Sequence, residues 1–434
     1  MLRQRAGRGA IPVRRGQLDL GRQESDATLG SGSGCLHPAP AFLAISPDLP
    51  PGAPLALDRC VRHARTQPRP ATCTPAEADA VWASSPPPRR PLHVTYILPH
   101  HHLTGGMKIL VEHVRGLRAR GHRVRTLLRG RASRAIPAWS DVQADEERVL
   151  AMDEPTAPAL AGTDVVVVGW FQNLFDWVGL GPPVLYFEQG HEILYGDRPQ
   201  GEAGERLEAQ FEQALRLPVS LVAVSPYVAE LLTGRFGRAV GVVVNGIDLE
   251  AFRPSSHPHG HRVLLVGNPR LPFKDFTTAL AAIQRAHRAV PDLSLTWVSQ
   301  VPVQLSASLF PFRNVVSPPQ AELPTLYREH DAFLFTSRYE SFPLPPIEAM
   351  ASGLPVITTR CGGVTTYARP GWNCAMAAPG DAAALGEALA AVLRDEAIAR
   401  LLGQRGRATA ERFTWDAALD ALEDALLRTA RLRS

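Results

Sequence analysis

Residues 332–357 read AFLFTSRYESFPLPPIEAMASGLPVI, and this stretch decides the fold class. It opens with an apolar run of strand length, and the loop that follows leads into a short helix predicted near 346–352. A second apolar run at 355–358 contains β-branched residues and predicts another strand. A strand, a helix and a strand in this order form one unit of an α/β fold with parallel strands.

The same alternation extends in both directions from this unit. In the C-terminal half, further strands are predicted at 262–267 and 293–298, with helices near 275–289, 322–330 and 381–393. In the N-terminal half, strands are predicted at 92–98, 122–128, 164–169, 184–188, 221–224 and 240–244, with a helix over 107–120. Two such rounds predict two Rossmann-like, doubly wound domains.

The boundary between the two predicted domains is expected at the polar, turn-rich run 254–261. This gives an N-terminal domain over 91–255 and a C-terminal domain over 256–414. A last helix, within 415–434, lies beyond the second round and is expected to join the first domain.

Residues 1–90 differ in composition from the rest of the chain. Pro, Gly, Ser, Ala and Arg dominate them, with breakers such as GSGSG at 30–34. Such a segment buries too little apolar surface to offset the entropy of ordering. We therefore expect a disordered extension with one short helix near 75–83, or a start codon placed too far upstream. The glycines at 30–34 follow no predicted strand, so they indicate no dinucleotide site.

Composition and charge exclude several classes of protein. The 434 residues are 45% apolar and 20% charged, which is typical of a globular domain, and the net charge of +4 comes mostly from the first 90 residues. Nucleic acid is therefore not an expected partner. Five scattered cysteines without a C-x-x-C pair favour a reducing compartment. No membrane-spanning run and no secretory signal are present, so a cytoplasmic protein is expected, with peripheral membrane association left open.

Glu340 and Glu348 are the main candidates for binding or chemistry. Glu340 follows a predicted strand directly, and Glu348 lies on the next helix. Because open α/β sheets bind ligands beyond the carboxyl ends of their strands, both carboxylates can accept hydrogen bonds from sugar and ribose hydroxyls in one crevice. On spacing alone, a helix-start carboxylate and a solvated surface charge are equally good interpretations.

The segment from Glu340 to Ile357 closely resembles the E-x7-E segment of glycosyltransferase family 4. The resemblance extends from about Leu92 to the C-terminus. It implies a GT-B fold, in which two Rossmann-like domains face a central cleft, and retaining transfer from a nucleotide sugar. Carried over by position, Glu340 contacts the donor sugar and Glu348 the ribose. The GT-B resemblance also implies that no metal or other cofactor is needed.

Gly105 and Gly106, after the first predicted strand, match the family's glycine loop. Without a Cβ, backbone N–H groups can approach the donor diphosphate or the acceptor. A tight turn before a helix is the alternative. The sequence RGHRV at 120–124 resembles the family's end of that helix and favours the functional interpretation.

Lys274 and Arg270 are the cations expected at the diphosphate. Relatives commonly carry an arginine just after the glycine of this loop and a lysine several residues later. Here Lys274 fits the lysine, but Asn268 occupies the arginine position, and Arg270 is a shifted substitute.

Three residues that follow Glu340 are also expected to bind the donor: Ser341, Phe342 and Leu344. Many relatives have glycine where this chain has Pro343. Proline has no N–H, so a backbone cradle here depends on Phe342 and Leu344.

Residues 186–192, YFEQGHE, are the predicted acceptor segment. Within it, His191 is the candidate for contacting a sugar hydroxyl, because the family often has a functional histidine after this strand of the first domain. A loop histidine without a role is the alternative. The run at 100–102 is HHH, but adjacent side chains diverge and no nearby carboxylate completes a metal site. Three aromatic residues fit an acceptor pocket or the core equally well: Trp170, Phe171 and Trp177.

The hypothesis is a retaining hexosyltransferase with Glu340, Lys274 and His191 as catalytic candidates. Its expected partners are a nucleotide-diphosphate sugar and a glycan, lipid-linked or small-molecule acceptor. Asn268 and Pro343 keep open a catalytically inactive GT-B scaffold, and a GT-B-type nucleotide-sugar epimerase is a further alternative. A dinucleotide-dependent oxidoreductase is disfavoured, because no G-x-G-x-x-G follows a predicted strand. Donor base, sugar, acceptor and oligomeric state are not readable from the sequence.

Overall fold

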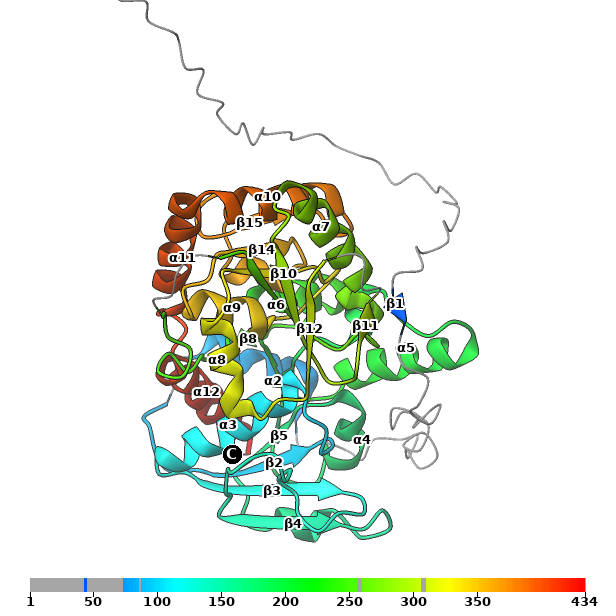
Figure 1. Cartoon of the computed structure of the whole chain (residues 1–434). Helices are drawn as coiled ribbons and strands as arrows, with labels where there is room; N and C mark the ends of the chain where they lie inside the picture. The colour runs from blue at the N-terminus through cyan, green and yellow to red at the C-terminus, as the bar shows by residue number, and fades with distance from the viewer. Residues whose placement is uncertain (1–42, 45–72, 86, 256–259, 306–309, 434) are drawn as a thin grey trace, which may run out of the picture. The chain divides into compact units, whose positions relative to one another are not determined.

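The computed structural model describes residues 43–44, 73–85, 87–255, 260–305 and 310–433 (Figure 1). Their strands form two parallel sheets and one short antiparallel pair, β1 (Leu43–Ala44) with β11 (Gln304–Leu305). The glycine run at 30–34 and the linker residues 256–259 lie outside the described residues. The disorder expected for most of the extension therefore stays a prediction.

The first sheet has seven parallel strands in the order β4-β3-β2-β5-β6-β7-β8. They are β2 (His93–Leu98), β3 (Arg123–Arg129), β4 (Glu146–Leu150), β5 (Val165–Val168), β6 (Val184–Glu188), β7 (Ser220–Ala223) and β8 (Val240–Val242). All four valines of β5 are fully buried, as a sheet covered on both faces requires. The strand order reverses between β2 and β5, which makes this pair the topological switch point.

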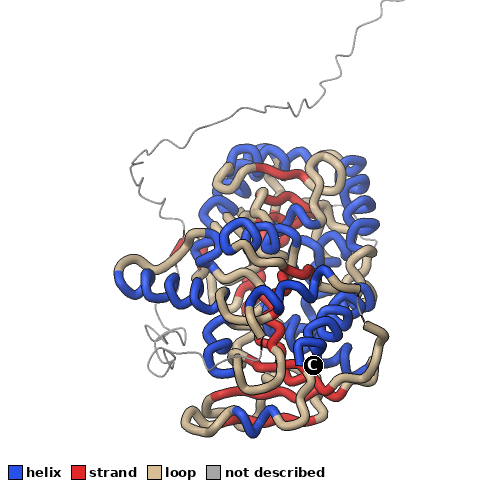
Figure 2. Tube along the Cα trace, turned by 180° about the vertical axis from the view of Figure 1, so that it is seen from behind, coloured by secondary structure: helices blue, strands red, loops and turns tan. Residues whose placement is uncertain are grey.

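Helices pack around this sheet, and Figure 2 shows the strands in red among blue helices. They are α3 (Gly105–Ala119), α4 (Leu174–Trp177), α5 (Glu202–Leu215) and α6 (Pro226–Phe236), with the 3-10 helices η2 (Ala157–Leu160), η3 (Phe171–Asn173) and η4 (Glu192–Tyr195). We call this sheet and its helices the N-terminal lobe. α3 begins two residues earlier than predicted, because the Thr104 hydroxyl accepts from Met107 N (3.2 Å) and caps it. Gly105 and Gly106 are thus the first helical turn, and the expectation of a glycine loop is wrong.

The second sheet has six parallel strands in the order β12-β10-β9-β13-β14-β15. They are β9 (Arg262–Val266), β10 (Ser294–Ser299), β12 (Phe312–Val316), β13 (Ala332–Phe335), β14 (Val356–Thr359) and β15 (Ala375–Ala377). Its switch point lies between β9 and β13. The sequence analysis missed β4, β12 and β15, because these edge strands are only partly buried and lack a continuous apolar run.

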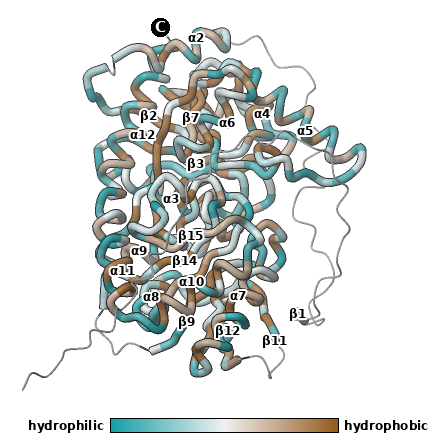
Figure 3. The backbone as a smooth tube through the Cα atoms, turned by 90° about the horizontal axis from the view of Figure 1, so that it is seen from above, coloured by the Kyte–Doolittle hydropathy of each residue, from teal (hydrophilic) through white to brown (hydrophobic). Residues whose placement is uncertain are grey.

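The helices on the second sheet complete a doubly wound arrangement, which we call the C-terminal lobe. They are α7 (Phe276–Ala289), α8 (Leu323–Arg328), α9 (Leu344–Ala351), α10 (Ala382–Arg394) and α11 (Glu396–Ala410), with η5 (Pro272–Lys274), η6 (Gln320–Glu322) and η7 (Gly363–Thr366). α10 packs against α7, and α11 packs against α9. Hydrophobic segments, brown in Figure 3, include much of the central strands.

The last long helix, α12 (Trp415–Ala430), crosses back to the N-terminal lobe and is followed by η8 (Arg431–Arg433). It lies beside α3, as Figure 1 shows in red and cyan. A Cβ added at Gly116 of α3 would lie only 2.4 Å from Leu419 Cδ1, so glycine permits this close packing. The Arg120 guanidinium adds an ion pair with Asp420 at 2.7 Å. The domain bounds 91–255 and 256–414 stay predictions.

Residues 73–85, which composition assigned to the extension, are structured. They contain α2 (Pro75–Ala80) and η1 (Val81–Ala83), where the short helix near 75–83 is predicted. Thr74 and Glu77 form a capping box, and Asp79 pairs with the buried Arg238 guanidinium at 2.7 Å. The expectation of disorder up to residue 90 is wrong here, because the stabilising partner lies 159 positions away and leaves no local signal.

Among the helices that the structure describes, none combines the length and apolarity of a membrane span. The described cysteines, Cys73, Cys361 and Cys374, form no disulfide. Burial raises the pKa of the Cys374 thiol to about 12, so this thiol is protonated and unreactive at neutral pH.

Candidate functional site

The loops after β9 and β13 meet at the switch point of the second sheet. β9 and β13 pair directly, so these loops leave the same edge, where open α/β sheets bind ligands. Hydrogen bonds join the loops: Arg338 N donates to Phe273 O (2.7 Å), and the Thr336 hydroxyl donates to Lys274 O (3.0 Å). These hydrogen bonds fix the loop that carries Lys274 against the loop that carries Glu340.

Lys274 and Glu340 form an ion pair, with Nζ and Oε1 2.5 Å apart and side chains 17% and 15% exposed. The Ser337 hydroxyl donates to the same carboxylate oxygen (3.0 Å). The ammonium also lies 5.2 Å from the Phe273 ring centroid and 5.6 Å from that of Phe335. Aromatic faces stabilise a partly desolvated cation, which can still donate to an anionic ligand.

The backbone of Glu340 is fixed by the loop after β14. Glu340 N donates to Cys361 O and Gly363 N donates to Glu340 O, each at 2.8 Å. A Cβ at position 363 would lie 1.9 Å from Ser341 O, so only glycine fits there. Glu340 is thus held at the end of the sheet, outside helix α9.

Glu348 lies on α9 with only 6% of its side chain exposed. Its Oε2 accepts from the Tyr327 hydroxyl (3.0 Å), and its Oε1 lies 3.5 Å from Lys108 Nζ of the N-terminal lobe. The alternative of a solvated surface charge is therefore wrong for Glu348. Sequence reasoning missed both Lys108 and Tyr327, since each lies far from α9 in the chain.

Free backbone donors follow Glu340. The N–H groups of Phe342 and Leu344 have no acceptor among the residues that the structure describes. The Phe342 ring is buried against Tyr367 and Phe413, with centroids 5.4 and 5.9 Å away, which anchors this turn. The second and third positions of α9 are prolines, so the first turn of this helix has fewer donors than usual.

Residues 186–192 of the N-terminal lobe lie opposite Ser341. The Ser341 hydroxyl lies 2.9 Å from the Tyr195 hydroxyl, and a Cβ at Gly190 would lie 1.6 Å from Ser341 Oγ. The Tyr339 hydroxyl donates to the Asp197 carboxylate. The predicted donor loop and the predicted acceptor segment are thus in direct contact.

Four aromatic rings stack across this contact between the lobes. Phe273 and Tyr339 come from the C-terminal lobe, and Tyr195 and Tyr227 from the N-terminal lobe. The successive centroid distances are 5.0 Å, 4.6 Å and 6.2 Å, with interplanar angles of 22°, 19° and 7°. Sequence reasoning missed Tyr195 and Tyr227, because nothing near them in the chain indicates a partner in the other lobe.

His191 is 9% exposed, and its ring packs against Trp170, Phe171 and Phe211. Its Nδ1 accepts from Ile193 N (3.3 Å), which leaves the proton of the neutral ring on Nε2. Burial lowers the pKa of His191, against the smaller opposing effects of nearby glutamates, and favours the neutral form. His191 can therefore donate one hydrogen bond through Nε2.

The two glycines at the start of α3 face the same region. A Cβ at Gly105 would lie 3.7 Å from Leu344 Cδ1, and one at Gly106 would lie 3.2 Å from the Gln189 amide. The N-terminal turn of α3 is therefore adjacent to both the donor loop and the acceptor segment.

Arg270 is exposed and makes no ion pair within the described part of the chain. The neighbouring Asn268 side chain accepts from Arg270 N (3.0 Å) and donates to Gln300 Oε1 (2.9 Å). The Arg270 side chain thus pairs with no carboxylate in the described residues, and Asn268 stabilises a turn.

The HHH run at 100–102 is bound by other contacts. His101 Nε2 lies 3.0 Å from Ala135 O, and burial lowers the pKa of His100 to about 4. Over the ranges that the structure describes, no three His, Cys, Asp or Glu side chains lie close enough to share a metal ion. Phe171 and Trp177 are fully buried core residues, while Trp170 is partly exposed beside His191.

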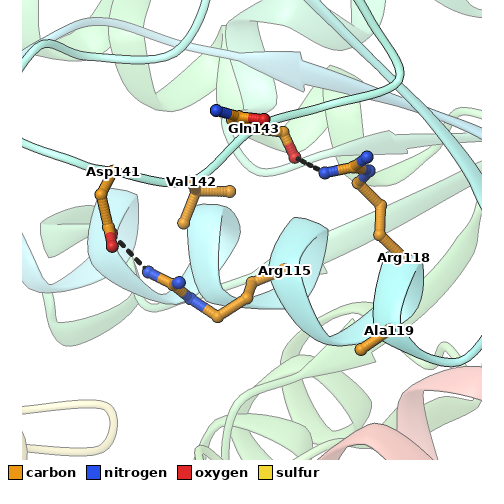
Figure 4. A pocket seen from close by; sticks show the side chains of 6 residues that line it. All are labelled: Arg115, Arg118, Ala119, Asp141, Val142 and Gln143. Atoms are coloured by element: carbon orange, nitrogen blue, oxygen red, sulfur yellow. Dashed lines mark hydrogen bonds and ion pairs between the residues drawn. The ribbon is translucent and has the colours of Figure 1, made fainter.

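A surface hollow of about 430 Å³ lies along the C-terminal half of α3 (Figure 4). Its arginines are already paired: Arg115 with Asp141 at 2.6 Å and Arg118 with Gln143 O at 2.7 Å. None of its lining residues belongs to the Lys274–Glu340 region, so it is not part of the candidate site.

Comparisons with known proteins show that this chain is similar to glycosyltransferases. Residues 260–395 match the family profile "Glycosyl transferases group 1". The chain is 28% identical over 221 residues to MMP alpha-(1->4)-mannosyltransferase of Mycolicibacterium hassiacum, covering 48% of this chain and 54% of that protein. It is 32% identical over 214 residues to glycogen synthase of Mycobacterium tuberculosis, covering 45% and 50%. The chain therefore spans about half the length of the curated relatives it matches.

Solved structures show the same fold. Sucrose-phosphate synthase from Thermosynechococcus elongatus superposes with a TM-score of 0.62 at 20% identity, covering 76% of this chain and 97% of that one. Anabaena HepE in complex with UDP-glucose superposes with a TM-score of 0.59 at 16% identity, covering 76% and 98%. The two lobes of this chain therefore form a GT-B fold.

Proposed function

We propose that this protein is a retaining glycosyltransferase of family 4, which moves a hexosyl group from a nucleotide-diphosphate sugar to a hydroxyl of an acceptor. The observation that carries the proposal is the Lys274–Glu340 pair at the switch point, inside the stretch that matches the glycosyl transferases group 1 profile. A cation that neutralises a diphosphate beside a carboxylate that binds hydroxyls is what a nucleotide-sugar site needs.

In this proposal Lys274 donates to the diphosphate as it leaves and so stabilises the charge that develops on it. The free N–H groups of Phe342 and Leu344, and the first turn of α3 at Gly105 and Gly106, add partial positive charge. The proposal includes no metal or other cofactor, in line with the resemblance.

Glu340 and Glu348 bind different parts of the donor. Glu340 accepts from hydroxyls of the hexose and Glu348 from hydroxyls of the ribose. Because Lys274 and Ser337 already hold the Glu340 carboxylate, we assign it to positioning the sugar and not to nucleophilic attack. As the bond from the sugar to the nucleoside diphosphate breaks, an oxocarbenium-like sugar forms, and the acceptor hydroxyl attacks it on the same face and gives its proton to the departing diphosphate.

His191 is placed to bind the sugar near the acceptor. With its proton on Nε2, the neutral ring can donate to a sugar hydroxyl. Contact between the lobes at Ser341 and Tyr195 brings this segment to the donor and excludes water that would hydrolyse it.

The relatives guide the choice of substrates. Their names include a mannosyltransferase and a glycogen synthase, and HepE was crystallised with UDP-glucose. We therefore propose a nucleotide-sugar donor and a glycan, lipid-linked or small-molecule acceptor. We place the reaction in the cytoplasm or at the inner face of the membrane, where polysaccharides and glycoconjugates are assembled.

A second candidate is a GT-B scaffold that binds without catalysing transfer. It is favoured by Asn268, whose side chain is used in a turn where relatives carry a cation, and by the prolines in and before the first turn of α9. Loss of these donors weakens stabilisation of the leaving group without removing the fold.

Thermal stabilisation by UDP-, GDP- and dTDP-sugars, followed by release of the nucleoside diphosphate in the presence of acceptors, tests both candidates. An enzyme is expected to be stabilised by one donor and to turn it over. Saturable binding without turnover would favour the scaffold, and absence of any nucleotide binding would contradict both.

A further inference from the structure

Lysine is almost absent from this chain. Of its 46 lysine and arginine residues, two are lysines, Lys108 and Lys274, and the other 44 are arginines. The two lysines contact the two glutamates of the candidate site: Lys274 pairs with Glu340 at 2.5 Å, and Lys108 with Glu348 at 3.5 Å. Elsewhere in the described chain, ion pairs to carboxylates use arginine or histidine. The chain thus retains a compact ammonium only beside these two glutamates.

Lys108 does not lie where a helix favours a positive charge. It belongs to the first turn of α3, where its N–H donates to Thr104 O (3.0 Å). The positive end of the helix dipole disfavours a cation there and attracts anions. Its side chain is 30% exposed and reaches Glu348 of the other lobe, and its Nζ also lies 5.9 Å from the Phe252 ring centroid. Helix stability therefore gives no reason for a lysine at this position.

We propose that Lys108 is the second cation of the nucleoside diphosphate site, provided by the N-terminal lobe. This inference rests on the proposed function, which places the hexose at Glu340 and the ribose at Glu348. A diphosphate connects ribose to hexose, so it must run between the two carboxylates. One lysine then lies at each end of that path.

At position 268 the C-terminal lobe has asparagine where the resemblance leads us to expect a cation. Asn268 is uncharged, its amide is used by Gln300 and Arg270 N, and the Arg270 side chain is exposed without an ion pair in the described residues. The Lys108 ammonium has three N–H donors, and its one hydrogen-bond acceptor among the described residues is Glu348 at 3.5 Å, so donors remain for phosphate oxygens. Charge and position both suit an anion that enters between the lobes.

A purely structural role would have a different signature. If Lys108 only joins the lobes through Glu348, its loss should affect every ligand alike. If Lys108 contacts phosphate, its loss should lower the affinity for ligands that carry phosphate groups and leave the affinity for the nucleoside unchanged. The comparison of a nucleoside diphosphate with its own nucleoside therefore separates the two roles.

The experiment uses calorimetry on the full chain and on the variants Lys108→Ala, Lys108→Arg and Arg115→Ala. The ligands are the tightest-binding of UDP, GDP and dTDP, and the corresponding nucleoside. Arg115 is the matched control, since it lies on the same helix and pairs with Asp141, outside the candidate site. Melting temperatures of all variants establish that they are folded.

We expect Lys108→Ala to lower the affinity for the nucleoside diphosphate by about 10- to 100-fold, since a charged hydrogen bond is lost. The affinity for the nucleoside should change by less than about two-fold. Lys108→Arg should recover part of the loss, and Arg115→Ala should match the parent. Equal losses for both ligands, no loss for either, or tighter diphosphate binding by Lys108→Ala would overturn the inference. If the parent chain binds no nucleoside diphosphate, the proposed function itself fails.

Discussion

Replacing Glu348 or Glu340 by glutamine should weaken the binding of different halves of the donor: the nucleotide half for Glu348 and the sugar half for Glu340. Glu348→Gln keeps the size of the side chain and its bond from the Tyr327 hydroxyl, but removes the charge that accepts from the ribose. Glu340→Gln removes the charge that faces the hexose and frees Lys274 from a partner at 2.5 Å. Glu348→Gln should therefore lower the affinity for the bare nucleoside diphosphate, and Glu340→Gln should leave that affinity nearly unchanged.

The size of the Glu348 effect follows from the change in hydrogen-bond type. Hydrogen bonds to charged groups contribute about 1.5–3 kcal/mol and neutral ones about 0.5–1.5 kcal/mol, so the substitution costs about 1–1.5 kcal/mol, or about 5- to 13-fold in affinity. The variant also releases Lys108, 3.5 Å away, which can only reduce this loss. For Glu340→Gln we expect nucleotide affinity within about two-fold of the parent and a transfer rate lower by about 100-fold.

Calorimetric titration with nucleoside diphosphate and transfer rates with the intact donor test these values. Glu387→Gln is the control, because this glutamate is 66% exposed on α10 and pairs only with Arg285 in the described residues. Equal losses of nucleotide affinity in the two variants, or unchanged transfer in both, would refute the assignment and support the scaffold.

Four further changes have measurable outcomes. Lys274→Ala should weaken nucleoside diphosphate binding by about 1.5–3 kcal/mol in calorimetry, and unchanged affinity would contradict its role. Burial lowers the pKa of His113 to about 3 while the unfolded residue titrates near 6.5, so stability should fall by about 1.4 kcal/mol per unit as the pH drops from about 6.5 towards 3. In urea unfolding, the free energy of unfolding should fall between pH 7 and pH 5 by about 2 kcal/mol less in His113→Leu than in the parent. Equal falls in the two proteins would be inconsistent with a neutral buried ring. Asp79→Ala, which leaves the Arg238 guanidinium with backbone acceptors only, should cost about 1.5–3 kcal/mol in thermal unfolding, and an unchanged melting temperature would show that α2 does not stabilise the fold. Gly363→Ala should abolish transfer by displacing the Glu340 backbone, and a fully active variant would show that this peptide is free to move.

The two Rossmann-like domains could be predicted because their central strands are buried and apolar and alternate with helices, while the GT-B arrangement was implied by the family resemblance. The resemblance assigned Lys274 and Glu340 to one donor, and the structure places them at neighbouring strand ends, since loops after adjacent parallel strands share an edge. Local pattern is enough where a feature depends on one lobe. It failed for the edge strands β4, β12 and β15, whose exposed faces interrupt the apolar run.

Features that join distant parts of the chain were not predictable. The Lys108–Glu348 pair and the Tyr195–Ser341 contact depend on how the two lobes meet, and no spacing in the sequence encodes that geometry. The same limit applies to α2, whose Asp79 finds its partner in Arg238. The Thr104 cap begins α3 at Gly105, so this glycine is helical where a loop was predicted, and its role at the donor stays a prediction.

The four stacked rings between the lobes provide an intrinsic spectroscopic signal for the distance between the lobes. Tyrosines at centroid distances of 4.6 and 6.2 Å couple their electronic transitions, and this coupling depends steeply on separation and angle. Any opening of the lobes must part Tyr195 from Tyr339, because the two rings belong to different lobes. Near-ultraviolet circular dichroism of the unlabelled chain should therefore follow that motion, with Tyr227→Phe and Tyr339→Phe identifying which rings contribute.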